Sequence, residues 1–386
     1  MAVKEGYKQT EVGVIPEDWE CTSFGEVLRV RHGKSQHDVS DKNGLYPILA
    51  SGGIIGFANS YLYDKPSVLI GRKGTIDVPQ YMDTPFWTID TLFYSEIYNN
   101  AVAKYVYYTF QTIEWYIFNE ASGVPSLNAK TIESIKFAKP PLPEQKAIAT
   151  ALSDIDGLID SLSKLIEKKK NIKQGAMQEL LTGKKRIEGF SGEWVEVKVS
   201  SFGEIVTGST PPTGNLEYWN GDIPWVTPTD IKGNKNIFKS ERCITIKGLS
   251  IIRQLKANSI LVTCIASIGK NAILKVAGAS NQQINAIMPN HKYNSDFLYY
   301  LFENNKQYLL SKAGITATNI VSKIIFSDML FSVPSTIEEQ TVIATILSDM
   351  DSEIEKHQVK LDKYKAIKQG MMQELLTGRI RLLKGA

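Results

Sequence analysis

Two long segments of this 386-residue chain carry its most regular pattern of apolar and polar positions. In each segment apolar residues recur at alternating steps of four and three, which is the heptad spacing of a coiled coil. The second series lies 195 positions after the first and includes one histidine. The predicted seam consists of Ile148, Leu152, Ile155, Ile159, Leu162 and Ile166, followed by Ile343, Leu347, Met350, Ile354, His357 and Leu361.

The two segments are copies of one sequence. Residues 144–183 and 339–378 align without a gap, and 23 of the 40 positions are identical. Each copy predicts one long helix, and 38 helical residues would span roughly 57 Å. Two apolar stripes in one chain can bury each other in a coiled coil. The alternative is that each stripe packs on its own globular domain, although helices of globular domains usually run ~8–20 residues.

Breaking and capping residues mark the ends of both predicted helices. Prolines at positions 140, 141 and 143 precede the first helix, while Thr336 and Glu339 have the spacing of a capping box before the second. Gly183 and Gly378 stand where a glycine commonly ends a helix. We therefore expect helical spacer segments at 141–185 and 336–386.

A globular segment precedes each helix, and the two share an order of elements. Each has a Trp followed by Ser-Phe-Gly-Glu, then a glycine-rich turn, two apolar strands and an aromatic-rich helical stretch. The strands are expected near 46–49, 67–70, 223–226 and 259–262, and the helical stretches near 105–118 and 297–310. The predicted fold class is α/β of the α+β kind, with a pseudo-twofold internal repeat. Its expected domains are 1–140, 141–185, 186–335 and 336–386.

Composition excludes several other classes of protein. Three scattered cysteines favour reduced thiols in the cytoplasm over a disulfide framework, and no apolar run is long enough to cross a membrane. No helix-opening GxGxxG turn and no metal-ligand spacing of His or Cys occurs, and Gly33-Lys34-Ser35 lacks the first glycine of a phosphate-binding loop. We therefore predict no catalytic residue, no cofactor and no metal.

Charge restricts where nucleic acid could bind. The net charge is only +3, and residues 1–140 hold 13 Lys and Arg against 16 Asp and Glu. Binding must therefore use local patches of basic and polar side chains. Any one such patch could equally be a solvated loop, a turn or a helix cap. The candidates in the first segment are Arg29, Arg31, His32, Lys34, Ser35, Arg72, Lys73, Thr75, Ser126 and Asn128. Those in the second are Thr207, Ser209, Thr227, Thr229, Asp230, Lys232, Lys270, Asn281, Gln282, Gln283, Thr318 and Asn319.

Several motifs resemble one family, the DNA specificity subunits of type I restriction–modification enzymes. They are the opening stretch 6–19 (GYKQTEVGVIPEDW), residues 223–231 (IPWVTPTDI), residues 141–145 (PLPEQ) and the two QELLTG helix ends. The resemblance covers nearly the whole chain and occurs twice in the same order. In the first segment residues 46–53 (YPILASGG) replace the fuller WVTPTD pattern.

The resemblance implies a function and partners. Each globular segment would be a target-recognition domain that reads one half of a split site on double-stranded DNA. The helices would form an antiparallel coiled coil that spaces these domains and docks two methyltransferase subunits, through which restriction subunits join. The subunit itself would be non-catalytic, in the cytoplasm and away from membranes. The alternative is a coiled-coil adaptor that recruits partners without reading DNA sequence.

Overall fold

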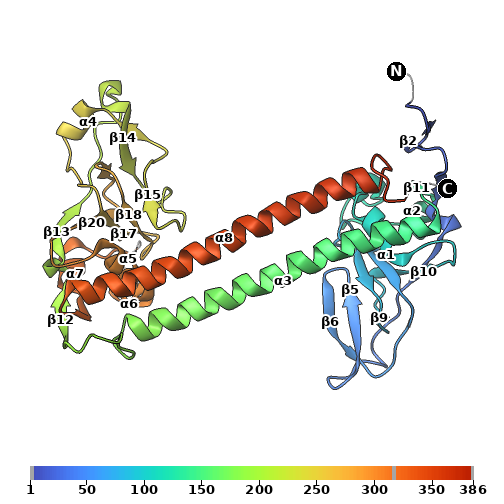
Figure 1. Cartoon of the computed structure of the whole chain (residues 1–386), viewed down its shortest axis with the longest axis horizontal. Coiled ribbons are helices and arrows are strands. Elements are labelled where there is room, and N and C mark those ends of the chain that lie inside the picture. The colour runs from blue at the N-terminus through green and yellow to red at the C-terminus, as the bar shows by residue number, and fades with distance from the viewer. Residues whose placement is uncertain (1–3, 315–318, 384–386) are drawn as a thin grey trace. The chain divides into compact units, whose positions relative to one another are not determined.

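The computed structural model describes residues 4–314 and 319–383. The chain divides into two compact units, one made of residues 1–163 and 359–386 and the other of residues 164–358. Each unit therefore holds one globular domain together with part of each long helix. These helices, α3 (Leu142–Leu180) and α8 (Ile337–Leu375), lie inside the two predicted spacer segments (Figure 1).

The first globular domain is built from two main sheets. The four-stranded sheet has the order β4 (Leu28–His32), β10 (Leu92–Ile97), β7 (Ser67–Gly71), β8 (Gln80–Met82). The three-stranded sheet has the order β6 (Gly53–Ala58), β5 (Tyr46–Ala50), β9 (Trp87–Thr88). The remaining strands form two pairs, β1 (Tyr7–Thr10) with β2 (Gly13–Pro16) and β3 (Glu20–Ser23) with β11 (Lys136–Lys139). The helices are η1 (Phe24–Glu26), α1 (Ala103–Phe110), η2 (Trp115–Phe118) and α2 (Ala129–Ser134).

The second globular domain follows the same plan with one more strand in its larger sheet. That sheet has the order β13 (Gly203–Thr207), β20 (Ile284–Pro289), β17 (Ser259–Thr263), β18 (Asn271–Leu274), β15 (Asn236–Ile237). The smaller sheet has the order β16 (Cys243–Ile244), β14 (Trp219–Val226), β19 (Ala279–Ser280), and β12 (Trp194–Lys198) pairs with β21 (Leu330–Pro334). The helices are η3 (Val199–Ser201), η4 (Leu216–Tyr218), α4 (Ile246–Ser250), α5 (Ser295–Asn304), α6 (Lys306–Ser311) and α7 (Lys323–Asp328).

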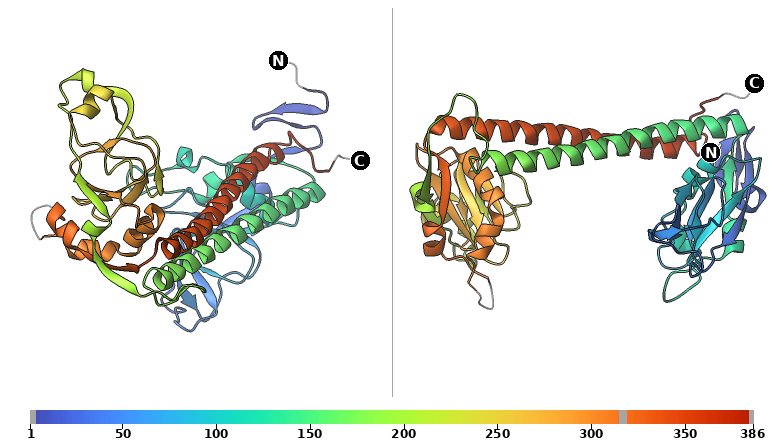
Figure 2. Two further views of the ribbon diagram at one scale, coloured as in Figure 1. Left: turned by 60° about the vertical axis from the view of Figure 1, so that its left-hand side comes forward. Right: turned by 90° about the horizontal axis from the view of Figure 1, so that it is seen from below.

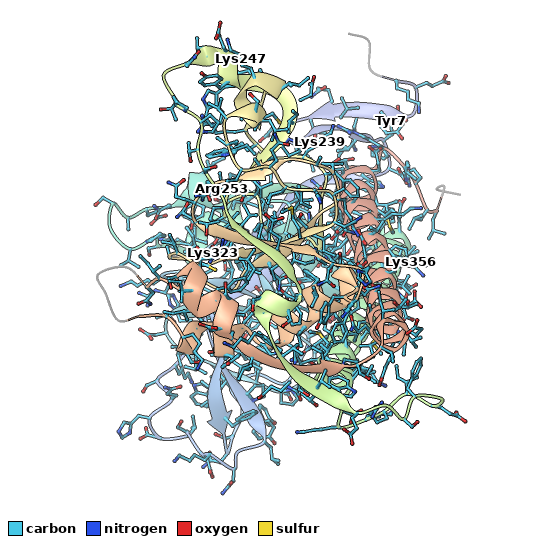
Figure 3. All side chains as sticks on the ribbon, turned by 90° about the vertical axis from the view of Figure 1, so that its left-hand side faces the viewer. Tyr7, Lys239, Lys247, Arg253, Lys323 and Lys356 are labelled. Atoms are coloured by element: carbon cyan, nitrogen blue, oxygen red, sulfur yellow. The ribbon has the colours of Figure 1, made fainter. Side chains whose placement is uncertain are left out.

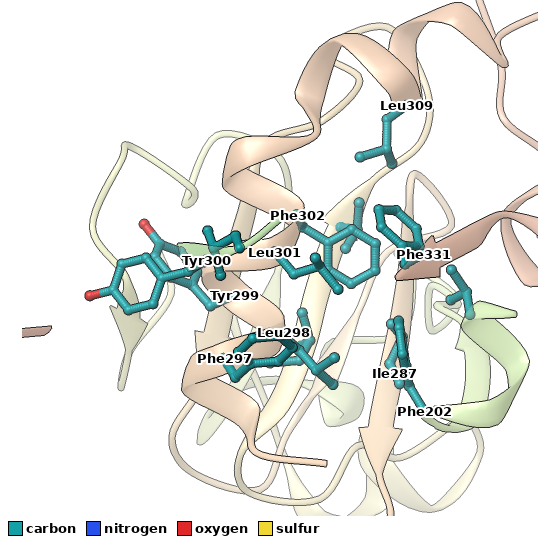
Figure 4. Close-up of a cluster of buried hydrophobic side chains, with 14 of the residues drawn as sticks. Phe202, Ile287, Phe297, Leu298, Tyr299, Tyr300, Leu301, Phe302, Leu309 and Phe331 are labelled. Atoms are coloured by element: carbon teal, nitrogen blue, oxygen red, sulfur yellow. The ribbon is translucent and has the colours of Figure 1, made fainter. Parts of the chain in front are cut away.

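Apolar runs form the centre of each larger sheet. Every residue of β7 and of β17 is buried, which agrees with the unbroken apolar runs in their sequences. The aromatic-rich stretch that follows is helical in both domains, but it is divided into α1 and η2 in one and α5 and α6 in the other. In the second domain this stretch supplies Phe302, whose ring lies 5.4 Å from that of Phe331 between centroids (Figure 4).

The long helices use their apolar stripes in two ways. Ile148 and Leu152 lie in the core of the first domain with Trp19 and Phe24, and Ile343 and Leu347 lie in the core of the second. Within each unit the two helices also lie side by side and antiparallel (Figures 1 and 2), as the ion pairs of Asp156 with Lys368 and of Lys173 with Asp351 require. None of the twelve predicted seam residues is fully exposed.

The helix ends agree only in part with the sequence expectation. Gly183 and Gly378 adopt φ of 69° and 71°, the left-handed conformation that ends a helix without strain in glycine. Thr336 accepts a hydrogen bond from the Glu339 backbone N–H at 3.4 Å. The Glu339 side chain, however, binds Arg186 instead of reaching back to Thr336, so the capping box is only half formed.

Candidate nucleic-acid interface

Both globular domains carry a polar face built in the same way from four loops. β5 and β9 run parallel with Leu49 opposite Thr88, and β14 and β19 run parallel with Val226 opposite Ser280. The turn after β5 is therefore held beside the turn after β9, and the turn after β14 is held beside the turn after β19. The Ile89 N–H donates to Leu49 O at 3.1 Å, and the Asn281 N–H donates to Val226 O at 3.0 Å.

A glycine turn packs against this pair of turns in each domain. It follows β4 in the first domain and β13 in the second. The backbone N–H of Lys34 donates to Thr88 O, and that of Ser209 donates to Ser280 O, both at 2.8 Å. A β-carbon on Gly33 would lie 2.0 Å from Ile89 O, and one on Gly208 would lie 2.2 Å from Asn281 O. Only glycine allows this approach, which explains the glycine that the sequence repeats at both places.

The loop after the central strand completes each face. The backbone N–H of Arg72 donates to Thr91 O at 2.8 Å, and that of Cys264 donates to Gln283 O at 2.8 Å. The first four-loop face consists of loops 32–35, 50–53, 72–75 and 88–91, and the second consists of loops 207–210, 227–230, 264–267 and 280–283. Residues 46–53 and 223–230, which the sequence aligned, occupy equivalent places.

Many of the candidate residues meet on these two faces. His32, Lys34, Ser35, Arg72, Lys73 and Thr75 belong to the first face, and Thr207, Ser209, Thr227, Thr229, Asp230, Asn281, Gln282 and Gln283 belong to the second. Ser126 and Asn319 adjoin the faces, because Ser126 forms a β-bridge with Lys73 and Asn319 O accepts from the Ala266 N–H. Lys34, Arg72 and Lys73 make no ion pair with any residue that the structure describes.

Three loops of the second face, 227–230, 264–267 and 280–283, contribute to the wall of a hollow of about 420 Å³. Its wall includes Thr227, Thr229, Asp230, Asn281 and Gln283. Internal hydrogen bonds fix these side chains: the Asp230 carboxylate accepts from the hydroxyl and the N–H of Thr227, each at 2.8 Å, and from the Glu241 N–H at 2.7 Å. The Asn281 amide donates to Gln283 Oε1 at 2.9 Å. The hollow is therefore shaped before any ligand enters, with hydroxyl and amide groups along its wall.

Several other candidates have places outside the faces. Arg29 and Arg31 lie on β4, and Arg31 pairs with Glu96 at 2.9 Å. Asn128 caps α2 by accepting from the Lys130 N–H at 2.9 Å, which is the capping role left open by the sequence. Lys232 and Lys270 are exposed just beyond loops of the second face. Thr318 lies outside the described residues.

Sequence reasoning missed further side chains at the second face. Arg242 lines the hollow, and its guanidinium lies 3.8 Å from the ring centroid of Trp219. Arg253 donates to Thr207 O at 2.8 Å, and it lines a neighbouring hollow with Lys323. Figure 3 shows Arg253 and Lys323 on the second domain. No local motif marks Arg242, because the tryptophans that hold it come from a different part of the chain.

The titratable groups near the second face give no sign of a nucleophile. Burial raises the pKa of the Cys264 thiol to about 11, so that it stays protonated near neutral pH. Among the described residues no cluster of His, Cys, Asp and Glu could hold a metal ion. In the same part of the chain, no helix is both long and apolar enough to cross a membrane.

Comparisons with known proteins fit this duplicated architecture. A family model described as the type I restriction modification DNA specificity domain matches residues 16–173 and again residues 191–362. These matches cover most of the chain, which therefore belongs to the family of type I restriction–modification specificity subunits, the class that supplies DNA sequence specificity in such a system.

Individual relatives span nearly the full length. The type I restriction enzyme MjaVIII specificity subunit of Methanocaldococcus jannaschii is 25% identical over 424 residues, covering 98% of this chain and 97% of the relative. The S subunit from M. genitalium has a similar fold, with a TM-score of 0.69, 12% identity and coverage of 97% and 98% of the two chains. A chain solved for the complex assembly and conformational transition of the type I R-M system matches with a TM-score of 0.55 at 12% identity, covering 95% of this chain and 99% of that one.

Proposed function

We propose that each four-loop face reads one half of a split target on double-stranded DNA. One observation carries the proposal: the chain builds the same face twice, on matching strands and glycine turns, and fills it with different side chains. A common frame with different polar groups is what two unlike half-sites need. We call each globular domain with its face a reader.

The two readers offer different chemistry to DNA. The first face presents Lys34, Arg72 and Lys73, which suit phosphate contacts as well as base edges. The second presents amides and hydroxyls around its hollow, and such groups can pair with adenine or with other base edges in the major groove. Gln282 accepts from Thr210 at 2.7 Å, so its amide nitrogen remains available to donate. Asp230, with three internal hydrogen bonds, is proposed to shape the turn.

The remaining parts of the proposal concern the assembly. We propose that the antiparallel helices dock two methyltransferase subunits, and that restriction subunits join through those. Two facts support an assembly: the relatives are named as specificity subunits of restriction enzymes, and the chain solved with a TM-score of 0.55 comes from work on complex assembly. We propose that the chain has no catalytic residue of its own and acts in the cytoplasm, where it would meet chromosomal DNA.

A binding experiment tests this function against the adaptor alternative. The full chain would be purified with its methyltransferase partner and exposed to random DNA at raised salt, because salt weakens the sequence-independent phosphate contacts. Enrichment of two short sequences separated by an undefined gap is the expected result. Equal binding to all sequences, with intact partner assembly, would favour the adaptor. Methylation-aware sequencing of the host genome before and after deletion of the gene gives the same answer in the cell.

A further inference from the structure

Arg242 is held at the edge of the second four-loop face by two tryptophans. Its guanidinium carbon lies 3.8 Å from the ring centroid of Trp219 and 5.2 Å from that of Trp225. The two indole rings meet edge to face, with centroids 5.0 Å apart and an angle of 90° between their planes. Both tryptophans are buried, yet Arg242 itself is exposed. Trp219 and Trp225, which we call the tryptophan pair, therefore support an arginine side chain that reaches solvent.

Hydrogen bonds hold the tryptophan pair and the backbone of Arg242 in place. The Trp219 indole N–H donates to Pro212 O at 3.2 Å, and that of Trp225 donates to Ser209 O at 2.9 Å, in a loop of the second face. The Trp225 backbone N–H also donates to Arg242 O at 3.2 Å. The arginine is thus connected to the same loop that carries the glycine turn at Gly208.

The guanidinium of Arg242 differs from other basic groups of the protein in its charge environment. Among the described residues no carboxylate lies within ion-pair distance of Arg242, although Glu241 and Asp230 also line the hollow. This differs from Arg31 and Lys247, which pair with Glu96 and Glu217. An arginine stacked on an aromatic ring keeps its N–H edges free, and stacking reduces the side-chain entropy lost when those edges bind a ligand.

We infer that Arg242 is a specificity-determining residue that reads guanine in the half-site of the second reader. The inference rests on the proposed function. A planar guanidinium matches the O6 and N7 acceptors of guanine in the major groove, which is the commonest specific arginine contact with DNA. The neighbouring Asn281, Gln283 and Thr229 would meet adjoining base edges. A phosphate contact is the competing role, and it requires charge but not the planar fork.

Substitution by glutamine, compared with substitution by lysine, separates these two roles. Binding selection on the full chain with its methyltransferase partner would compare wild type, R242K and R242Q, with K247Q as a control that also removes one cation from the second domain. We expect R242Q to lose preference for guanine at one position of one half-site by roughly 5- to 100-fold, and R242K to lose only part of it, because a lysine ammonium can donate to the same acceptors without the planar fork. The other half-site and the gap should not change, and K247Q should select the wild-type sequence. Equal melting temperatures would show that the variants are folded.

A modified base tests the same contact from the DNA side. Replacing the identified guanine by 7-deazaguanine removes the N7 acceptor and should weaken wild-type binding several-fold, but it should have little further effect on R242Q. If R242Q keeps the full guanine preference, or if it weakens binding equally at every sequence, the inference is wrong while the proposed function stands. If wild type itself selects no sequence, the proposed function fails and the inference fails with it.

Discussion

Asp156 and Asp351 lie 195 residues apart and make the same contacts in their two units. The Asp156 carboxylate accepts from the Tyr108 hydroxyl at 2.8 Å and pairs with Lys368 at 2.7 Å. Asp351 accepts from the Tyr300 hydroxyl at 2.6 Å and pairs with Lys173 at 2.5 Å. One carboxylate thus ties the aromatic helix of each globular domain to both long helices. Burial raises the pKa of each tyrosine well above its usual value, so both hydroxyls remain donors.

Removing this carboxylate charge should loosen each unit separately. Asp156→Asn and Asp351→Asn should each lower the free energy of unfolding by about 1–2 kcal/mol, because the ion pair is lost and the tyrosine hydroxyl then donates to a neutral amide oxygen. Chemical denaturation followed by fluorescence would measure the change. Asp154→Asn and Asp349→Asn are matched controls on the exposed side of the same helices. Equal losses in the controls would show that helix charge, and not this contact, matters.

An arginine that follows each long helix pairs with a glutamate in the first turn of the other long helix. Arg381 pairs with Glu144 and Asp18, both at 2.7 Å, and Arg186 pairs with Glu339 at 2.9 Å. Because Glu144 and Glu339 are buried, Arg381→Met and Arg186→Met should each destabilise the protein by about 3–5 kcal/mol. The loss should be larger for Arg381, which has two carboxylate partners. A larger loss for Arg186 in urea denaturation would contradict this interpretation.

The same cluster predicts a dependence on pH. The hydrogen bond from Arg381 lowers the pKa of Asp18 below its ordinary value. The unfolded chain therefore binds the proton more tightly, and the stabilisation is complete above the unfolded pKa of about 3.9 and is lost as pH falls through the lower folded pKa. The stability difference between wild type and Asp18→Asn should be constant from pH 6 to 8 and should shrink below about pH 4. Urea denaturation at each pH would measure it, and a difference that grows in acid would refute the assignment.

The glycine turns should act on one half-site each. An alanine at Gly208 would place a β-carbon 2.2 Å from Asn281 O and force the second face to move. We expect Gly208→Ala to weaken selection of one half-site and Gly33→Ala to weaken the other. Gly214→Ala is the control, because its β-carbon would have no neighbour within 4 Å. Binding selection with unchanged sequences for both variants would mean that these faces do not read DNA.

The sequence predicted the long helices well because heptad spacing is a local signal. It left open where the stripes are buried, and the structure combines both alternatives. Leu152, which the heptad pattern assigned to the seam, lies in a core with Trp19 and Phe24, residues brought there only by the fold. A charge at Leu152 would therefore damage the first globular domain itself, and not only the pairing of the helices.

The two four-loop faces were predictable in part, because some of their features are local in the sequence. Glycine turns and polar runs such as Asn281-Gln282-Gln283 are visible in the sequence, so their loops could be identified. The sequence could not show which polar side chains use their oxygens for hydrogen bonds within the protein. Asp230 and Asn128 make such bonds only in the folded chain. Arg242 was missed because its aromatic support from Trp219 and Trp225 depends on tertiary contacts.

The central claim is that two independent readers supply the two halves of one DNA target. The most direct measurement replaces residues 22–140 by the equivalent segment of a relative and repeats binding selection on the full chain with its methyltransferase partner. The exchanged segment contains all four loops of the first face and none of the second. One half-sequence should change, while the other half and the gap remain as in wild type. A change in both halves, or in neither, would contradict independent reading.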